Sequence, residues 1–195
     1  MRLDARAALQ CHEFLHKSFA PSCFDLTDRA PESAMMRELK RQGDLHEART
    51  IENLMTKNLD ILVINKEQGE IEKELTTAEA LTNSTAQIII GAWISSVCEE
   101  KIAELTGRET ASDPDRVSRP DLLIRVGEGT DGKPRWAPVD IKSHDPINEN
   151  KSSKLYLAKW DSLLPTDGVE TIARLDLDDA AQLAHYHEHL RTLGL

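Results

Sequence analysis

The chain has 195 residues, of which 30% are charged and 39% hydrophobic, as is typical of a folded domain rather than a disordered segment. Its formal net charge of −10 excludes a surface that is basic throughout, so any contact with a nucleic acid must depend on a local site. No stretch approaches the roughly 18 apolar residues that a membrane-spanning helix needs.

The cysteines and the N-terminus indicate a reducing compartment. The three cysteines, Cys11, Cys23 and Cys98, are an odd and sparse set, and the first ten residues lack the apolar segment of a signal peptide. We therefore expect a cytoplasmic protein with reduced thiols and no membrane partner. The length suits a single domain over residues 1–195, either stand-alone or the N-terminal part of a longer protein.

Helical spacing of apolar residues dominates the first half of the chain. We expect a short helix within 1–19 and a long one from about 34 to 57, in which Gly43 marks a kink or a break. The further predicted elements are a short apolar run at 61–65, a helix at 77–85, a strand or core-facing helical segment at 86–94, and a helix at 99–107 that Gly107 ends.

The second half predicts a β-hairpin followed by a helix. Strands at 121–126 and 135–142 flank a loop rich in turn residues at 127–134, and Pro138 places the second strand at a sheet edge or a bulge. Residues 178–193 form the closing helix. The fold class is therefore α/β or α+β: a mixed sheet that contains a hairpin and is flanked by helices.

An acid and a base share the second hairpin strand, in the segment WAPVDIKSH at 136–144. Because strand side chains alternate, Asp140 and Lys142 point the same way, and antiparallel pairing brings Asp121 beside them. Two carboxylates and the Ile141 carbonyl make an oxygen site suited to Mg²⁺ or Mn²⁺. A lysine there can orient or deprotonate water for phosphodiester hydrolysis. A solvated surface ion pair is the alternative interpretation of Asp140 and Lys142.

These residues resemble a nuclease signature. Pro120-Asp121, a hairpin and then Asp140-Ile141-Lys142 look like the PD-(D/E)xK motif, and the phrase RPDLLIRV…WAPVDIKSH is similar to RecB-like nucleases. RQGDLHEARTIENL at 41–54 resembles an early Gly-x-x-His-Glu helix, and QLAHYHEHL at 182–190 resembles a closing Gln-x-x-x-Tyr motif. The resemblance covers roughly residues 5–195 and points to the RecB branch, which includes CRISPR-associated adaptation nucleases.

The resemblance implies a restriction-endonuclease-like core and a role for each matching residue. The metal ligands would be His46, Asp121, Asp140 and the Ile141 carbonyl; Lys142 would activate water; Gln182 and Tyr186 would contact the DNA backbone and support the lysine. The alternatives are an ordinary surface histidine for His46 and a core position for Tyr186. Glu47 is expected to be a solvated or helix-pairing carboxylate, and we retain it as a further candidate ligand.

Three further sequence features limit the interpretation. Many RecB-type nucleases hold an iron–sulfur cluster with three cysteines after the core; because no cysteine follows Cys98, we expect no cluster in this chain. His185 and His189 have the spacing to share a zinc ion, but no further ligand pattern lies nearby, so we expect solvated histidines. Lys151 and Lys154 belong to a lysine-rich segment, 142–159, that can supply phosphate contacts.

The expected function is metal-dependent hydrolysis of DNA, as single strands or duplex ends, in repair, recombination or defence. There is no phosphate-binding loop of a motor, so a helicase or another protein would be a separate partner. The alternative is a catalytically weak or inactive nuclease fold that serves nucleic-acid binding or assembly. The residues do not distinguish DNA from RNA, exonuclease from endonuclease action, or one metal ion from two.

Overall fold

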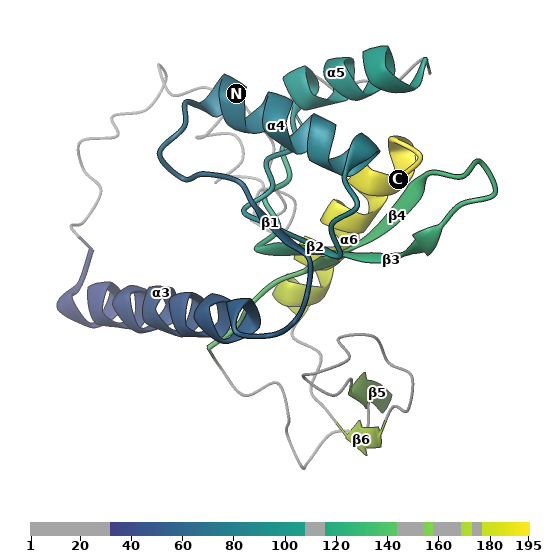
Figure 1. Cartoon of the computed structure of the whole chain (residues 1–195). Coiled ribbons are helices and arrows are strands. Elements are labelled where there is room, and N and C mark those ends of the chain that lie inside the picture. The colour runs from purple at the N-terminus through teal and green to yellow at the C-terminus, as the bar shows by residue number, and fades with distance from the viewer. Residues whose placement is uncertain (1–31, 108–115, 144–153, 158–168, 173–176) are drawn as a thin grey trace.

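The computed structural model describes residues 32–107, 116–143, 154–157, 169–172 and 177–195. Its elements in chain order are α3 (Ala34–Met55), β1 (Ile61–Val63), α4 (Glu70–Asn83), β2 (Ile88–Ile90), α5 (Ser96–Thr106), β3 (Leu122–Glu128), β4 (Pro134–Val139), β5 (Lys154–Leu157), β6 (Val169–Ile172) and α6 (Leu177–Thr192). The first four strands form one mixed sheet in the order β1-β2-β3-β4, with β1 and β2 parallel and the other neighbours antiparallel (Figure 1). β5 and β6 form a separate antiparallel pair. The expected mixed sheet with flanking helices is thus confirmed.

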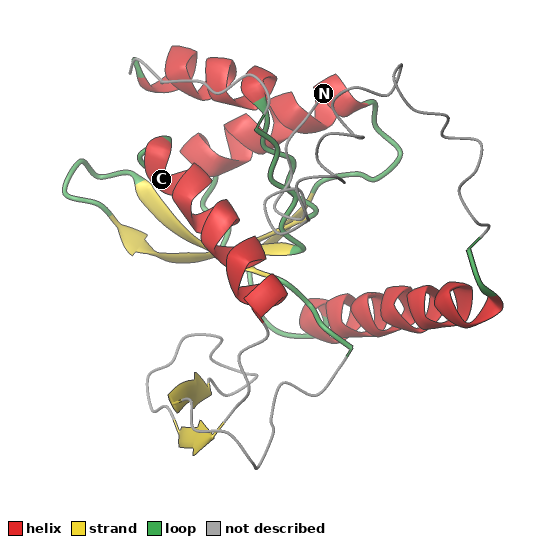
Figure 2. Cartoon of the chain, turned by 180° about the vertical axis from the view of Figure 1, so that it is seen from behind, coloured by secondary structure: helices red, strands yellow, loops and turns green. Residues whose placement is uncertain are grey.

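The strand β2 lies inside the sheet, and all three of its isoleucines are buried. Because side chains alternate across a strand, Ile89 faces one side of the sheet, while Ile88 and Ile90 face the other. Ile89 belongs to the larger core, where α4, α5 and α6 cover the sheet (Figure 2). Ile88 and Ile90 pack with Leu54, which is the buried residue of α3. The sheet therefore separates α3 from the other three helices.

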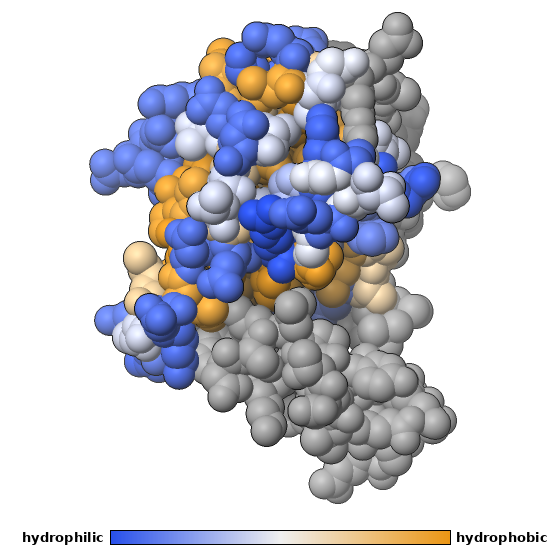
Figure 3. All heavy atoms as spheres, turned by 45° about the vertical axis from the view of Figure 1, so that its right-hand side comes forward, coloured by the Kyte–Doolittle hydropathy of each residue, from blue (hydrophilic) through white to orange (hydrophobic). Residues whose placement is uncertain are grey.

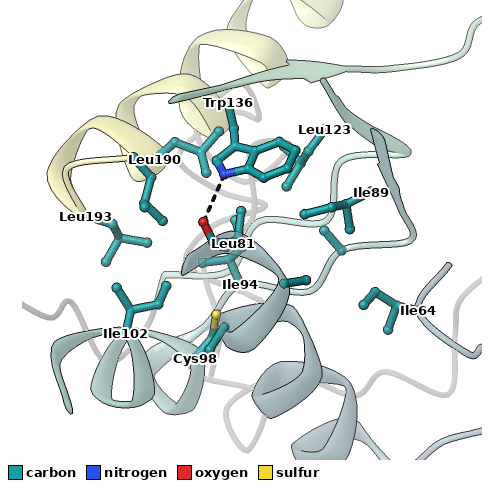
Figure 4. Packing of buried hydrophobic residues seen from close by; sticks show 14 residues of the cluster. Ile64, Leu81, Ile89, Ile94, Cys98, Ile102, Leu123, Trp136, Leu190 and Leu193 are labelled. Carbon is teal, nitrogen blue, oxygen red and sulfur yellow. Dashed lines mark hydrogen bonds between the residues drawn. The ribbon is translucent and has the colours of Figure 1, made fainter. Parts of the chain in front are cut away.

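Trp136 of β4 is the largest side chain of the main core. It is 3% exposed and packs among Leu123, Leu190 and other buried aliphatic residues (Figure 4). Its indole Nε1 donates a 3.0 Å hydrogen bond to the carbonyl oxygen of Leu81, the dashed line in Figure 4. A buried indole N–H needs such an acceptor, so this bond fixes the C-terminal part of α4 against the hairpin.

The helix termini follow from local sequence. Ser33 caps α3, because its Oγ accepts a 3.1 Å hydrogen bond from the Met36 amide. The helix then continues through Gly43, so the expectation that it breaks at this residue is wrong. Gly107 ends α5 in the left-handed conformation, with φ 67°, as predicted from the sequence.

The second hairpin strand ends earlier than predicted. β4 stops at Val139, so Asp140 and Lys142 follow the strand instead of lying within it. The reason is that the Ile141 amide donates to the side chain of Asp121 rather than to a backbone carbonyl of β3. β4 is an edge strand, as Pro138 suggested; the irregularity in the hairpin lies in β3, between Arg125 and Gly127.

Hydrophilic residues predominate on one face of the described structure (Figure 3). On the face shown in Figure 3, charged and polar residues cover most of the described surface, with hydrophobic residues visible between them. Within the described residues, no helix is long and apolar enough to span a membrane. The short helix expected within 1–19 and two of the three cysteines lie outside the described residues.

Candidate active site at the open end of the hairpin

The two aspartates of the predicted motif meet where the hairpin opens. Leu122 pairs with Val139 at the end of the ladder, so Asp121 and Asp140 lie one residue beyond this pair, Asp121 before β3 and Asp140 after β4. The Ile141 amide donates a 2.6 Å hydrogen bond to Asp121 Oδ2. The predicted approach of Asp121 to Asp140 is therefore confirmed, although Asp140 lies just after the strand.

Lys142 lies at the centre of a polar network that joins the hairpin to α6. Its ammonium group forms ion pairs with Asp140 and, at 3.1 Å, with Asp179. It also donates a 3.1 Å hydrogen bond to Gln182 Oε1. The Gln182 amide nitrogen in turn donates to Asp140 Oδ1 at 3.4 Å and to the Tyr186 hydroxyl at 2.8 Å. One amide thus contacts the lysine, the acid and the tyrosine.

Tyr186 occupies a core position and also bonds to Gln182, while its expected contact with the DNA backbone stays a prediction. Its ring is 6% exposed and therefore belongs to the packed interior, while its hydroxyl oxygen accepts the bond from Gln182. Burial raises the pKa of Tyr186, and the charges of Asp140 and Asp121 act in the same direction. The hydroxyl is therefore neutral at physiological pH and holds the orientation of Gln182.

The electrostatics of the site reflect crowded carboxylates. The pKa of Asp121 is raised to about 7, mainly by burial; the charges of Asp140 and Glu47 act in the same direction, and the hydrogen bond from the Ile141 N–H acts against them. For Lys142, burial lowers the pKa, but the bonds to Asp140 and Asp179 outweigh it, and the pKa rises. Lys142 is therefore a cation at neutral pH.

The helix α3 presents Glu47, not His46, to Asp121. Glu47 lines a pocket together with Asp121 and forms a 3.3 Å ion pair with Lys66. His46 is exposed and is not part of the pocket wall. Glu47 is partly buried and pairs with Lys66 outside its own helix, so the expected pairing within the helix is wrong. Its role as a metal ligand stays a prediction.

The oxygen donors of the site fit a hard divalent cation. Asp121 and Asp140 lie together, and repulsion from the charge of Asp140 adds to the effect of burial in raising the pKa of Asp121. A bound Mg²⁺ or Mn²⁺ would relieve that repulsion. Within the described residues, no three His, Cys, Asp or Glu side chains are grouped to hold a metal ion by themselves. A cation here would therefore also use water, phosphate or backbone oxygens, such as the Ile141 carbonyl.

Sequence reasoning missed Asp179, the second anionic partner of Lys142. Asp179 precedes Gln182 by three residues, so both lie on the same face of α6. The signal was present in the sequence: an acid one helical turn before the Gln-x-x-x-Tyr motif.

The histidines of α6 do not form one solvated group, which corrects the expectation made from sequence. His189 is 1% exposed; its Nδ1 lies 2.8 Å from Ser118 Oγ, and its Nε2 lies 2.6 Å from Glu99 Oε1. Ser118 is 0% exposed and Glu99 2% exposed, so this Ser–His–Glu chain is closed to a substrate. It connects α5, the segment before β3 and α6, and we assign it a structural role. His185 contacts the Val117 carbonyl, while His187 is exposed.

The lysine-rich segment lies mostly outside the described residues. Lys151 lies outside the described residues, and the side chain of Lys154, the first residue of β5, does so as well. Comparisons of the chain with protein-family models, with curated proteins and with solved structures gave no match.

Proposed function

We propose that this protein is a divalent-metal-dependent nuclease of the PD-(D/E)xK type, with a RecB-like, restriction-endonuclease-like core. The observation that carries the proposal is the convergence of Asp121, Asp140 and Lys142 at the open end of a hairpin, with Gln182 holding both members of the Asp140–Lys142 pair. This arrangement joins two acids for a metal ion to a cation for a phosphate, as in-line hydrolysis of a phosphodiester requires. The substrate would be DNA, as single strands or duplex ends.

Each residue has a role that follows from its contacts. Asp121 and Asp140 would hold the metal ion with the Ile141 carbonyl, and Glu47 on α3 would add negative charge beside Asp121. When bound, the ion supplies Lewis acidity and offsets charge on the phosphate. Because its pKa is raised, Lys142 acts as a hydrogen-bond donor that orients water and stabilises phosphate oxygens rather than as a proton acceptor. Gln182 keeps the ammonium group directed at Asp140.

One observation favours the alternative of a nucleic-acid-binding module without cleavage. The Lys142 ammonium already has three partners, Asp140, Asp179 and Gln182, and so is held in a closed network. An active enzyme must free at least one of these bonds for water or phosphate. If the network stays closed, the chain binds a nucleic acid but does not hydrolyse it.

The test combines metal binding with cleavage. The purified chain is titrated with Mg²⁺ and Mn²⁺ while thermal stability is recorded, and is then incubated with end-labelled single-stranded DNA, duplex DNA and RNA. Asp140→Asn removes one charge of the pair with little change in shape. We expect this variant to lose the metal-dependent stabilisation and to cleave at least about a hundredfold more slowly.

A matched control is Asp44→Asn, which changes an exposed carboxylate of α3 that is outside the pocket wall. It should respond to metal as the wild type does. Glu47→Gln and His46→Ala then decide which of these neighbouring residues takes part in metal binding. Metal binding that is weakened only in Glu47→Gln supports Glu47, and metal binding that is weakened only in His46→Ala supports His46. Wild-type metal response and cleavage in Asp140→Asn would refute the proposed site.

A further inference from the structure

A pocket of about 190 Å³ lies beside Asp121 and is not explained by metal binding. Its wall combines two carboxylates, Glu47 and Asp121, with Trp93 and three cations: Lys66, Lys73 and Arg119. The chain has a formal net charge of −10, whereas the wall of this pocket carries three cations and two carboxylates. The pocket therefore differs in charge from the chain as a whole. The pocket therefore has an acidic part at the aspartates and a basic part at Trp93.

Two of these cations are held by the indole of Trp93 rather than by a carboxylate. The Arg119 guanidinium carbon lies 3.7 Å from the ring centroid, and Lys73 Nζ lies 5.7 Å from it. Cation–π contacts of this kind position a positive charge without neutralising it. Within the described part of the chain, neither residue has a carboxylate in ion-pair contact, whereas Lys66 pairs with Glu47. Two charges are thus positioned and left uncompensated.

The basic part is connected to the aspartates through the backbone. The backbone amide of Trp93 donates a 3.1 Å hydrogen bond to Thr77 Oγ1, which ties the backbone at Trp93 to α4. The Gly91 amide donates a 3.1 Å bond to the Asp121 carbonyl, so the strand that leads to Trp93 is attached to the residue before β3. Arg119 precedes Asp121 by two residues. Two short connections therefore set the distance between the basic part and Asp121: the hydrogen bond from Gly91 to Asp121, and the two residues of chain from Arg119 to Asp121.

We propose that Lys73 and Arg119 bind a phosphate group of the substrate strand next to the phosphate that is cleaved. The inference rests on the proposed function, because it places a neighbouring phosphate relative to Asp121 and Asp140. A strand that enters an acidic site is repelled unless cations lie along its path, and phosphate contacts by Lys and Arg provide most of the affinity for nucleic acids. Trp93 keeps the two cations in place in the free protein, so little ordering is required when the strand binds.

Binding without cleavage tests the pocket directly. A fluorescein-labelled single-stranded oligonucleotide is titrated with the metal-free chain in EDTA, and its anisotropy is followed at several salt concentrations. We expect Lys73→Gln and Arg119→Gln each to weaken binding about tenfold, the size of one charge-assisted contact. The double variant should also reduce the slope of log affinity against log salt by about 0.7, the value for one phosphate contact on a single strand, and each single variant by a part of this.

Two matched controls remove a charge elsewhere. Lys101→Gln and Arg191→Gln break surface pairs with Glu104 and Glu188, outside the pocket wall, and should leave affinity and salt slope unchanged. Lys73→Arg and Arg119→Lys retain the charge and should restore most of the binding, which excludes misfolding as the cause of the loss.

The outcomes separate this inference from the proposed function. If the wild type cleaves DNA and the two pocket variants bind and cleave as it does, the pocket inference fails while the nuclease stands. If the wild type shows no cleavage but the pocket variants lose affinity, the nuclease proposal fails while phosphate binding by Lys73 and Arg119 stands. An equal loss of binding in the control variants also overturns the inference, because the pocket would then have no special role.

Discussion

The metal-free protein should become less stable as the pH rises from about 4 to about 7, because of Asp121. Burial raises its folded-state pKa to about 7, against 3.8 for the ordinary carboxyl. The unfolded chain therefore releases a proton in this window while the folded chain retains it. The stability that the protonated carboxyl contributes is fully present below about pH 4 and lost as the pH rises through about 7, and the curve is flat above that. Asp121→Asn is neutral at every pH and should remove this loss.

The size of the effect follows from the pKa values. Each pKa unit corresponds to about 1.4 kcal/mol, so the rise from 3.8 to about 7 sets an upper limit of about 4 kcal/mol. The carboxyl remains partly accessible to water, and screening reduces the expected gain in Asp121→Asn to about 1–2 kcal/mol at pH 8. For a chain of this length, such a gain raises Tm by about 2–8 °C.

The assay is urea or thermal unfolding in EDTA between pH 4 and 8, with wild type, Asp121→Asn and the exposed-site control Asp44→Asn. We expect the variant to equal the wild type near pH 4 and to exceed it at pH 8, while the control follows the wild type throughout. Added Mg²⁺ or Mn²⁺ should raise the stability of the wild type at pH 8 and leave Asp121→Asn unchanged. A variant that is less stable than the wild type at pH 8 would refute the reasoning, because the carboxylate would then be well stabilised as an anion.

Three further predictions concern the contacts around the site. His189→Ala leaves Glu99 buried without its imidazole partner. It should lower the free energy of unfolding, measured in urea, by about 3 kcal/mol or more. A loss below about 1 kcal/mol would contradict a structural role for His189. Lys142→Met leaves Asp140, whose side chain is 7% exposed, without its cation. It should lower the free energy of unfolding by about 2 kcal/mol in urea at pH 8 and abolish measurable cleavage. Full activity of this variant would exclude Lys142 from catalysis. Trp136→Phe removes the hydrogen bond to the Leu81 carbonyl and should lower the free energy of unfolding by about 1–3 kcal/mol, measured by thermal unfolding. An unchanged Tm would show that this bond does not contribute to stability.

The hairpin end could be predicted from the sequence because its geometry is local. Once two strands and a turn are recognised, antiparallel pairing leaves Asp121 opposite the segment that begins at Asp140. Gln182 and Tyr186 could be placed on one helical face by their spacing. That this face meets Lys142 required the packing of α6, which no local pattern specifies.

The orientation of α3 could not be predicted, for a physical reason. Its apolar residues do not form one buried face: Leu54 is buried, but several others remain largely exposed. The exposed apolar residues of α3 are Met35, Met36, Leu39, Leu45 and Met55. When the hydrophobic pattern does not determine the packed side, nothing in the sequence shows whether His46 or Glu47 faces the sheet. The structure answers this through Leu54 and the partly buried Ile51, which pack against the cluster that contains Ile88 and Ile90 of β2.

The buried chain of Ser118, His189 and Glu99 was also beyond sequence reasoning. Its bonds connect residues 71 and 90 positions apart, and each residue stands alone in its own segment. Buried polar groups are tolerated only with partners, but the sequence does not show which residue is the partner.

The Gln182 bridge has a consequence for the order of events during synthesis. The ribosome makes Asp121, Asp140 and Lys142 well before the helix that carries Gln182 and Tyr186, so the nascent chain holds its acids and lysine without the amide that orients them. Contacts of such long sequence separation form late in folding. If the proposed nuclease activity depends on this bridge, the nascent chain cannot cleave nearby messenger RNA or DNA before α6 has been made and has docked.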